Sequence, residues 1–242
     1  MTQVEQLQQL VNQSRRMVAF TGAGCSTESG VPDFRSVDGL YRQTWNYPPE
    51  EILSHEFFLQ HPEEFYRFYR AKMLFPHARP NPAHRKLAQL EAAGRLSAVI
   101  TQNIDGLHQQ AGSKRVLELH GSVHRNFCMD CGKPYPLDAI LETEGLPRCS
   151  CGGLIKPDVV LYGECLDDRV LDQSIRELER ADLLLVGGTS LSVYPAAGLL
   201  RYFRGSHLVL INKTPTDRDR DAQLVIPQPI GQVLEQLEVL PL

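Results

Sequence analysis

Residues 17–36 read MVAFTGAGCSTESGVPDFRS. The first four residues are an apolar run typical of a buried strand, and Gly22 and Gly24 follow it in a Gly-X-Gly turn. The polar residues 26–29 come next and favour the start of a helix. Glycine has no Cβ to obstruct a phosphate, and the N–H groups at a helix N-terminus face anions. The stretch therefore predicts a nucleotide site with a pyrophosphate, although a lone Gly-X-Gly fits an ordinary turn equally well.

This turn departs from the two common phosphate-binding patterns. The dinucleotide fingerprint has a third glycine three residues after the second, where this chain has Thr27. The P-loop requires Gly-Lys-Ser/Thr, which does not follow here. The nucleotide hypothesis therefore depends on the rest of the chain.

Composition narrows the class of protein. The chain has 242 residues, enough for one large domain or a domain with an insertion, and it is 42% hydrophobic and 22% charged. A net charge of -4 and the lack of a basic run give no indication of nucleic-acid binding. No apolar run approaches the roughly 18 residues of a membrane span, and the polar, amphipathic residues 2–16 do not resemble a signal peptide. We therefore expect a cytoplasmic protein that binds neither membrane nor nucleic acid.

Short apolar runs alternate with helical patterns along most of the chain. The runs cover residues 17–20, 98–101, 116–119, 183–186 and 208–211, and the helical patterns cover 2–16, 81–91, 168–181, 195–204 and 230–238. This alternation predicts an α/β fold, a Rossmann-like parallel sheet with helices on both faces. Four runs end in groups that suit a ligand, at residues 22–24, 102–105 and 188–190 and at Asn212. Because ligands of such sheets bind at the C-terminal ends of the strands, we expect these groups to converge.

Two stretches interrupt this alternation. Residues 48–75 are helical and aromatic, with a helix expected from Pro62, and predict an inserted module with an aromatic core. Residues 126–155 contain Cys128, Cys131, Cys149 and Cys151. Two close pairs of cysteines supply the four sulfur ligands of a structural zinc site, which leaves no position for water. An iron–sulfur cluster or a redox dithiol is the alternative.

Two titratable residues are candidates for chemistry. His120 follows a predicted strand and lies between Leu119 and Gly121, where a neutral imidazole is either a general base or a hydrogen-bonded structural group. Asp105 follows the run 98–101 and suits a hydrogen bond to a ribose or an amide. The other histidines are expected to be surface or core residues, with His84 packing or capping its helix.

The motifs together resemble one family. GAGCSTESGVPDFRS, TQNIDGLHQQAG, ELHGS, KPDVVLYGE, VGGTSLSVYPAA and the paired cysteines are similar to those of the sirtuins, and of their short bacterial members in particular. Sirtuins are NAD-dependent protein lysine deacylases. The resemblance implies that residues 1–36, 77–125 and 156–242 form a Rossmann-like NAD-binding domain. Residues 37–76, a helical module, and 126–155, a zinc-binding module, would form a small domain.

The resemblance also implies a reaction. An acetyl-lysine protein or peptide enters a cleft between the domains, its acyl oxygen attacks C1′ of the nicotinamide ribose, and nicotinamide leaves. The products are free lysine and 2′-O-acetyl-ADP-ribose. In this scheme His120 acts as general base on the ribose hydroxyls, Phe34 shields the reactive sugar, Arg35 contacts phosphate and Asp105 binds the carboxamide. The implied NAD-binding set is Gly22, Ala23, Gly24, Thr27, Asp33, Phe34, Arg35, Gln102, Asn103, Ile104, Asp105, His120, Gly188, Thr189, Ser190, Asn212, Lys213 and Ile230.

The same resemblance implies how substrate is recognised. The peptide adds as a strand to segments that contain Val160, Leu161, Tyr162, Gly163 and Val193, and Tyr69 lies at the acyl group. Family members that remove succinyl or malonyl groups carry an arginine three residues after this tyrosine, where the chain has Lys72. Because lysine lacks the two-point grip of arginine on a carboxylate, we expect acetyl rather than acidic acyl groups.

Four other functions are compatible with parts of the sequence. A mono-ADP-ribosyltransferase would use the same activated ribose, and a deacylase for longer or acidic groups would use the same site. A dehydrogenase is disfavoured because the third glycine of the fingerprint is missing. A non-enzymatic zinc module would leave the four strand ends unexplained.

Overall fold

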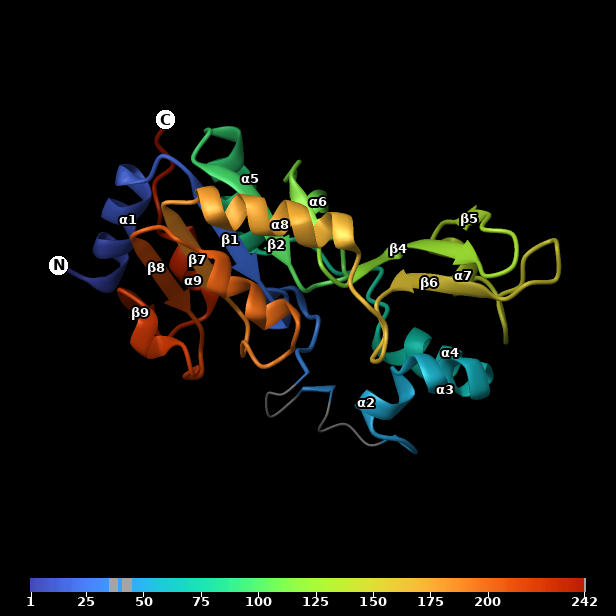
Figure 1. Ribbon diagram of the computed structural model, residues 1–242. Helices are drawn as coiled ribbons and strands as arrows, with labels where there is room; N and C mark the ends of the chain where they lie inside the picture. The colour runs from blue at the N-terminus through green and yellow to red at the C-terminus, as the bar shows by residue number, and fades with distance from the viewer. Residues whose placement is uncertain (35–38, 41–44, 242) are drawn as a thin grey trace.

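A six-stranded parallel sheet forms the larger part of the fold. The computed structural model describes residues 1–34, 39–40 and 45–241. The strand order is β3-β2-β1-β7-β8-β9, and every neighbouring pair is parallel (Figure 1). The strands are β1 (Met17–Thr21), β2 (Leu96–Thr101), β3 (Val116–Glu118), β7 (Leu183–Gly187), β8 (His207–Ile211) and β9 (Leu224–Ile226). All five expected runs are strands of this sheet, and β9, a short edge strand, was not expected.

The strand order fixes where a ligand can bind. In the sheet, β2 and β3 lie on one side of β1. The later strands β7, β8 and β9 lie on the other side of β1. The order therefore reverses between β1 and β7, and a crevice opens at the C-terminal ends of strands at such a point. Because β2, β1, β7 and β8 are consecutive neighbours, all four expected strand ends meet at this one edge.

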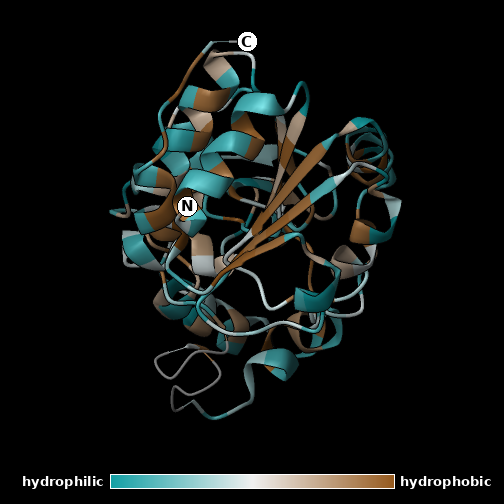
Figure 2. Ribbon diagram, turned by 90° about the vertical axis from the view of Figure 1, so that its left-hand side faces the viewer, coloured by the Kyte–Doolittle hydropathy of each residue, from teal (hydrophilic) through white to brown (hydrophobic). Residues whose placement is uncertain are grey.

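Helices cover both faces of the sheet, as expected. Met17 and Ala19 of β1 pack against one layer, and Val18 and Phe20 pack against the other. The first layer is α1 (Gln3–Gln13), α5 (Pro82–Ala92) and α9 (Ile230–Glu235); the second is α8 (Asp168–Arg180) and the 3-10 helix η4 (Ala196–Tyr202). The strands are largely hydrophobic between the helices (Figure 2). Burial on both faces explains why the strand sequences are continuously apolar rather than alternating.

Helix ends follow local side-chain chemistry. Asn81 caps α5, with its side chain accepting from the Ala83 N–H and His84 Nδ1 accepting from the Asn81 N–H. His84 therefore caps its helix, as expected. The expected helix 230–238 ends at Glu235, and the expected helix 195–204 is the 3-10 helix η4.

A second, antiparallel sheet of order β5-β4-β6 lies beside the first, at the right of Figure 1. Its strands are β4 (Gly121–Cys128), β5 (Pro134–Tyr135) and β6 (Ile155–Val159). It shares an aromatic-rich core with α2 (Pro49–Ile52), α3 (His55–Gln60) and α4 (Pro62–Lys72), and α7 (Asp138–Leu141) adds Ile140. Residues 48–75 are mostly helical as expected, and one of these helices, α4, begins at Pro62 as predicted. β4 was not expected, because His124 and Arg125 interrupt its apolar pattern.

None of the helices in the described part of the chain is both long and apolar enough to cross a membrane.

Candidate functional site

The turn after β1 is pressed against the turn after β7. It consists of two 3-10 turns, η1 (Ala23–Cys25) and η2 (Thr27–Ser29), rather than the start of an α-helix. The Gly24 N–H donates to the Gly188 carbonyl at 2.8 Å, and the Gly22 N–H donates to the Gly187 carbonyl at 3.3 Å. The glycines are therefore required by contact between two protein turns, in addition to any approach of a phosphate.

Gly188 shows this requirement most clearly. Its φ is +63°, and a Cβ placed there would lie 2.2 Å from the Cys25 nitrogen. At Gly24 a Cβ would lie 2.9 Å from the Gly188 Cα. Thr27 supports the turn from within, since its hydroxyl donates to the Gly24 carbonyl at 3.0 Å. Ala23 and Thr27 lie on the same turn, as expected for a phosphate cradle.

A buried serine joins the turn to the end of β2. The Ser26 hydroxyl donates to Asp105 Oδ2 at 2.6 Å and accepts from the Asn103 side-chain amide at 3.0 Å. Asp105 Oδ1 also accepts from the Leu107 N–H at 2.9 Å. Sequence reasoning did not single out Ser26, although its position two residues after Gly24 was a signal. The hydroxyl orients both side chains that were expected to meet the nicotinamide end of NAD.

The electrostatics of Asp105 follow from its burial. Loss of solvent raises the pKa of Asp105 above its ordinary value, against the lowering effect of its hydrogen bonds from Ser26 and the Leu107 N–H. Its carboxylate is therefore held by neutral donors rather than by a cation. This suits a carboxyl group that recognises an amide.

A second link crosses the sheet edge. The Gln102 side-chain amide donates to the Thr189 hydroxyl at 2.9 Å, and that hydroxyl also accepts from the Leu191 N–H at 3.1 Å. The Thr189 side chain therefore connects the ends of β2 and β7. Ser190 beside it pairs with the Ser192 hydroxyl at 2.7 Å.

His120 lies in the turn between β3 and β4. Its Nδ1 is 3.0 Å from the Gln102 carbonyl oxygen, which can only accept, so Nδ1 carries the proton and Nε2 presents a lone pair. Burial lowers the pKa of His120, although the bond to the Gln102 carbonyl raises it in part. The imidazole is therefore neutral near pH 7 and has the tautomer of a general base.

The part of the expected NAD-binding set near α9 and the end of β8 has its own supporting contacts. The Glu28 carboxylate accepts from the Gly231 N–H at 2.7 Å and so holds the start of α9 against the turn. Ile230 lies against Gly187, where a Cβ would be 2.2 Å from Ile230 Cδ1. The Asn212 side chain donates to the Thr214 carbonyl at 2.8 Å, and Lys213 is exposed.

Two more of the expected NAD-binding residues lie next to the second sheet. Phe34 and Ile104 are partly buried and pack against the core of the second sheet. The Leu40 N–H donates to the Asp33 carbonyl at 2.8 Å, which fixes the described part of that loop. Arg35 lies outside the described residues.

The segment expected to bind substrate is hydrogen-bonded to His120. The Val160 N–H donates to the His120 carbonyl at 3.0 Å, and Tyr162 pairs with Ser54 as an isolated parallel bridge. Leu161 is buried, Gly163 is exposed and Val193 is half-buried outside the sheet. Tyr69, which was expected at the acyl group, lies instead in the aromatic core with none of its surface exposed, stacked on Phe65 with ring centroids 5.4 Å apart, so in this structure it presents no surface to a substrate.

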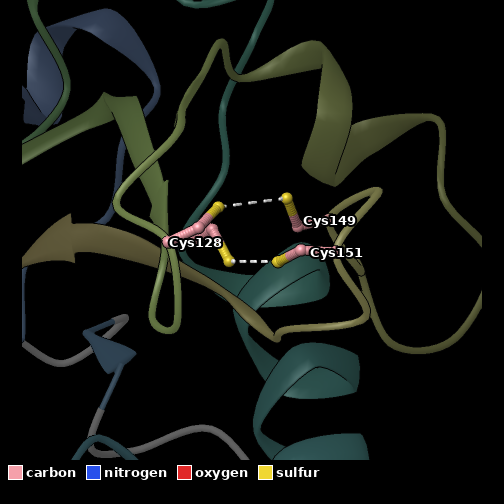
Figure 3. A group of neighbouring side chains, drawn as sticks. Cys128, Cys149 and Cys151 are labelled. Atoms are coloured by element: carbon pink, nitrogen blue, oxygen red, sulfur yellow. Dashed lines mark hydrogen bonds between the residues drawn. The ribbon is translucent and has the colours of Figure 1, made fainter.

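Four cysteines converge beyond β4. Their sulfurs lie within 4.8 Å of one another, with Cys128 to Cys151 at 3.5 Å and Cys131 to Cys149 at 3.6 Å. Figure 3 shows Cys128, Cys149 and Cys151 turned toward a common centre. A tetrahedron of Zn–S bonds of about 2.3 Å has sulfurs about 3.8 Å apart, whereas a disulfide is about 2.05 Å long. The donor set fits one zinc ion with no open position, and the Tyr135 hydroxyl supports it by donating to the Cys149 sulfur at 3.0 Å.

A second group of buried metal-capable side chains, Cys25, His84 and His108, lies under the glycine turn. Because His84 Nδ1 accepts from the Asn81 N–H, its Nε2 carries the proton and points at the Cys25 sulfur 4.0 Å away. His108 Nε2 is 3.0 Å from the Thr21 hydroxyl. Burial also raises the pKa of the Cys25 thiol. A metal here would require the other His84 tautomer and would break the α5 cap, so the group is better described as a hydrogen-bonded core.

Comparisons with known proteins agree with one another. A family model described as the Sir2 family matches residues 22–195. The chain is 56% identical over 236 residues to an NAD-dependent protein deacetylase of Clostridium acetobutylicum, covering 96% of each. It is 55% identical over 236 residues to an NAD-dependent protein deacetylase of Cutibacterium acnes, covering 97% of each. A solved structure of Sir2 with a p53 peptide and NAD+ superposes with a TM-score of 0.85 at 43% identity, covering 98% of this chain and 97% of that chain.

Proposed function

The chain belongs to the Sir2 family, and we propose that it is an NAD-dependent protein lysine deacetylase. It transfers the acetyl group of acetyl-lysine to ADP-ribose and releases nicotinamide and 2′-O-acetyl-ADP-ribose. The observation that carries this assignment is the position of His120. Its ring is fixed by the carbonyl at the end of β2, and its own carbonyl accepts from Val160 of the expected peptide segment. One residue thus connects the cofactor side of the site with the substrate side.

NAD is a co-substrate here, and it supplies the ADP-ribose that accepts the acetyl group. The turn at Gly22–Gly24 would hold its phosphates through backbone N–H groups. Asn103 and Asp105, oriented by Ser26, would hold the nicotinamide end. Gly188, Thr189, Ser190, Asn212, Lys213 and Ile230 would hold the adenosine half. Phe34 would shield the sugar from water, and Arg35 would contact phosphate.

His120 acts as a base at Nε2. The Gln102 carbonyl keeps the proton on Nδ1, so that Nε2 remains available to accept a proton from a ribose hydroxyl. Burial favours the neutral ring, since it disfavours the charged form. The Gln102 carbonyl and the burial of the ring therefore both leave Nε2 unprotonated and able to accept the proton of a ribose hydroxyl.

The four-cysteine site would hold a structural zinc ion. It joins the end of β4 to the loop before β6, and so closes the small sheet at the end far from His120. With Cys128, Cys131, Cys149 and Cys151 all bound, the metal has no position for a reacting water. This sheet, with the helical module, would form the small domain, and the parallel sheet would form the NAD-binding domain.

The acyl group is expected to be acetyl. Lys72 follows Tyr69 at three residues, where a bidentate arginine would be needed to clamp an acidic acyl group. The peptide would bind by strand addition to Val160, Leu161, Tyr162, Gly163 and Val193. None of the described cysteines forms a disulfide, which fits a reducing compartment such as the cytoplasm.

Mass spectrometry of acetyl-lysine and succinyl-lysine versions of one peptide, each with and without NAD, tests the function. We expect NAD-dependent loss of acetyl with formation of O-acetyl-ADP-ribose, and weak succinyl activity. His120→Ala should abolish nicotinamide release while NAD binding survives. His207→Ala is the control, because His207 is the first residue of β8 and so lies at the N-terminal end of this strand, away from the C-terminal ends where the site lies. Full turnover in His120→Ala would contradict the assigned base, and ADP-ribose on protein without loss of acetyl would favour a transferase.

A further inference from the structure

A partly buried glutamate, Glu164, closes the turn formed by the last of the expected peptide-binding residues. The Glu164 N–H donates to the Leu161 carbonyl at 3.0 Å, and the Leu161 N–H donates back to Glu164 Oε2 at 2.9 Å. Gly163 has a φ of +90°, the conformation that this kind of four-residue turn requires at its third residue. Both backbone groups of Leu161 are therefore held by one residue. The carboxylate fixes the path of the segment at this point.

A buried lysine fixes the same carboxylate from the strand side. Lys156 Nζ donates to Glu164 Oε2 at 3.1 Å, to the Val159 carbonyl at 3.0 Å and to the Pro157 carbonyl at 3.3 Å. Its side chain is only 9% exposed, and an ammonium group has three donors, so every donor has a partner. The Lys156 ammonium group therefore links the end of β6 to the turn at residues 161–164.

A histidine fixes the carboxylate from the helical side. His55 Nδ1 is 2.8 Å from Glu164 Oε1 and must donate, because a carboxylate oxygen accepts. The His55 N–H also donates to the Tyr162 carbonyl at 2.9 Å, and the Tyr162 N–H donates to the Leu53 carbonyl at 3.0 Å. In Figure 1 the chain between β6 and α8 runs down to these helices. The carboxylate is thus the common point of β6, the turn and α3.

We propose that Glu164, held by Lys156 and His55, is a positioning residue that sets the acetyl-lysine peptide site. The inference rests on the proposed deacetylase function and deepens it. A buried ion pair is weak evidence for stability, since desolvation offsets the attraction. Here the pair instead holds the backbone to which the peptide adds as a strand, next to the residue whose N–H bonds the His120 carbonyl. None of the three side chains belongs to the expected NAD set, so the effect should fall on the peptide.

The test separates peptide binding from NAD binding. Glu164→Gln keeps the shape but removes the charge, and a misplaced backbone weakens substrate alignment, so we expect the KM for an acetyl-lysine peptide to rise about tenfold. The KM for NAD and kcat should stay within about twofold. Lys156→Met removes the buried charge itself and should raise the peptide KM in the same way. Because the two residues act as one unit, the double variant should be little worse than either single variant.

Glu177→Gln is the matched control. Glu177 is another glutamate held by cations: its side chain is 4% exposed and is paired with Arg16 and Arg115 at 2.8 Å, but it lies on α8 away from the peptide segment. It should lower thermal stability without changing the peptide KM. An unchanged peptide KM in both Glu164→Gln and Lys156→Met, or equal increases in the peptide and NAD values, would overturn the inference. If the unaltered protein itself failed to deacetylate the peptide with NAD, the proposed function would fail instead.

Discussion

Replacing Gly188 with alanine should separate the turns after β1 and β7, which form the proposed NAD site. A side chain at φ +63° costs about 1–2 kcal/mol in any L-residue. In addition, the new Cβ would lie 2.2 Å from the Cys25 nitrogen, so the turns must part by on the order of 1 Å to reach van der Waals contact. That movement breaks the bond from the Gly24 N–H to the Gly188 carbonyl, worth about 1 kcal/mol. We expect a loss of about 3 kcal/mol in the free energy of unfolding.

Gly145→Ala is the control for this experiment, because Gly145 has a φ of +74° and no atom within 4 Å of the Cβ position. It carries the backbone strain without the collision, so it should lose only about 1–2 kcal/mol of the free energy of unfolding. Denaturant unfolding gives the stabilities, and calorimetric titration gives the NAD affinity. A 1 Å misplacement can cost about a hundredfold, so we expect Gly188→Ala to weaken NAD binding by at least tenfold and Gly145→Ala to leave it unchanged. Equal stability and equal NAD affinity in the two variants would refute the contact argument.

Three further predictions concern pH and metal. Because burial lowers the pKa of His120, the acid limb of kcat/KM should titrate below the ordinary histidine value of 6.5, and a limb above it would contradict the assignment. Burial lowers the pKa of His84 to about 4, so the unfolded state binds a proton first as pH falls. The free energy of unfolding should therefore decrease by up to about 3 kcal/mol from pH 6.5 toward pH 4. Urea unfolding at a series of pH values measures this decrease, and in His84→Gln the urea midpoint should depend less on pH over the same range. Elemental analysis should find one zinc per chain, lost in Cys131→Ser with a lower Tm; iron or visible absorbance would identify a cluster instead.

Part of the candidate site could be predicted from the sequence, because the residues concerned are close together in the chain. Each strand end is an apolar run followed at once by small or polar groups, and parallel pairing brings such ends to one edge. The cysteine spacing was readable for the same reason, since two close pairs need only one fold-back to meet. Ser26 was missed, because its partners Asn103 and Asp105 come from another strand. β4 was missed because its polar residues interrupt the apolar pattern of a strand, and its strand conformation depends on pairing with β6, which is distant in sequence.

The sequence by itself determined the class of fold, and it predicted the four converging strand ends and a four-cysteine metal site. These depend on local patterns: continuous apolar runs for a sheet buried on both faces, and close cysteine pairs for a metal. The position of His120 alone left its role open, and only the family resemblance implied that it is the base. Only the tertiary structure decided which tautomer His120 holds, why position 188 must be glycine, and what fixes the peptide segment. Those answers are contacts between residues far apart in the chain, such as Gly188 with Cys25 and Glu164 with His55. No local pattern records them, because they arise only when the strands are ordered and packed.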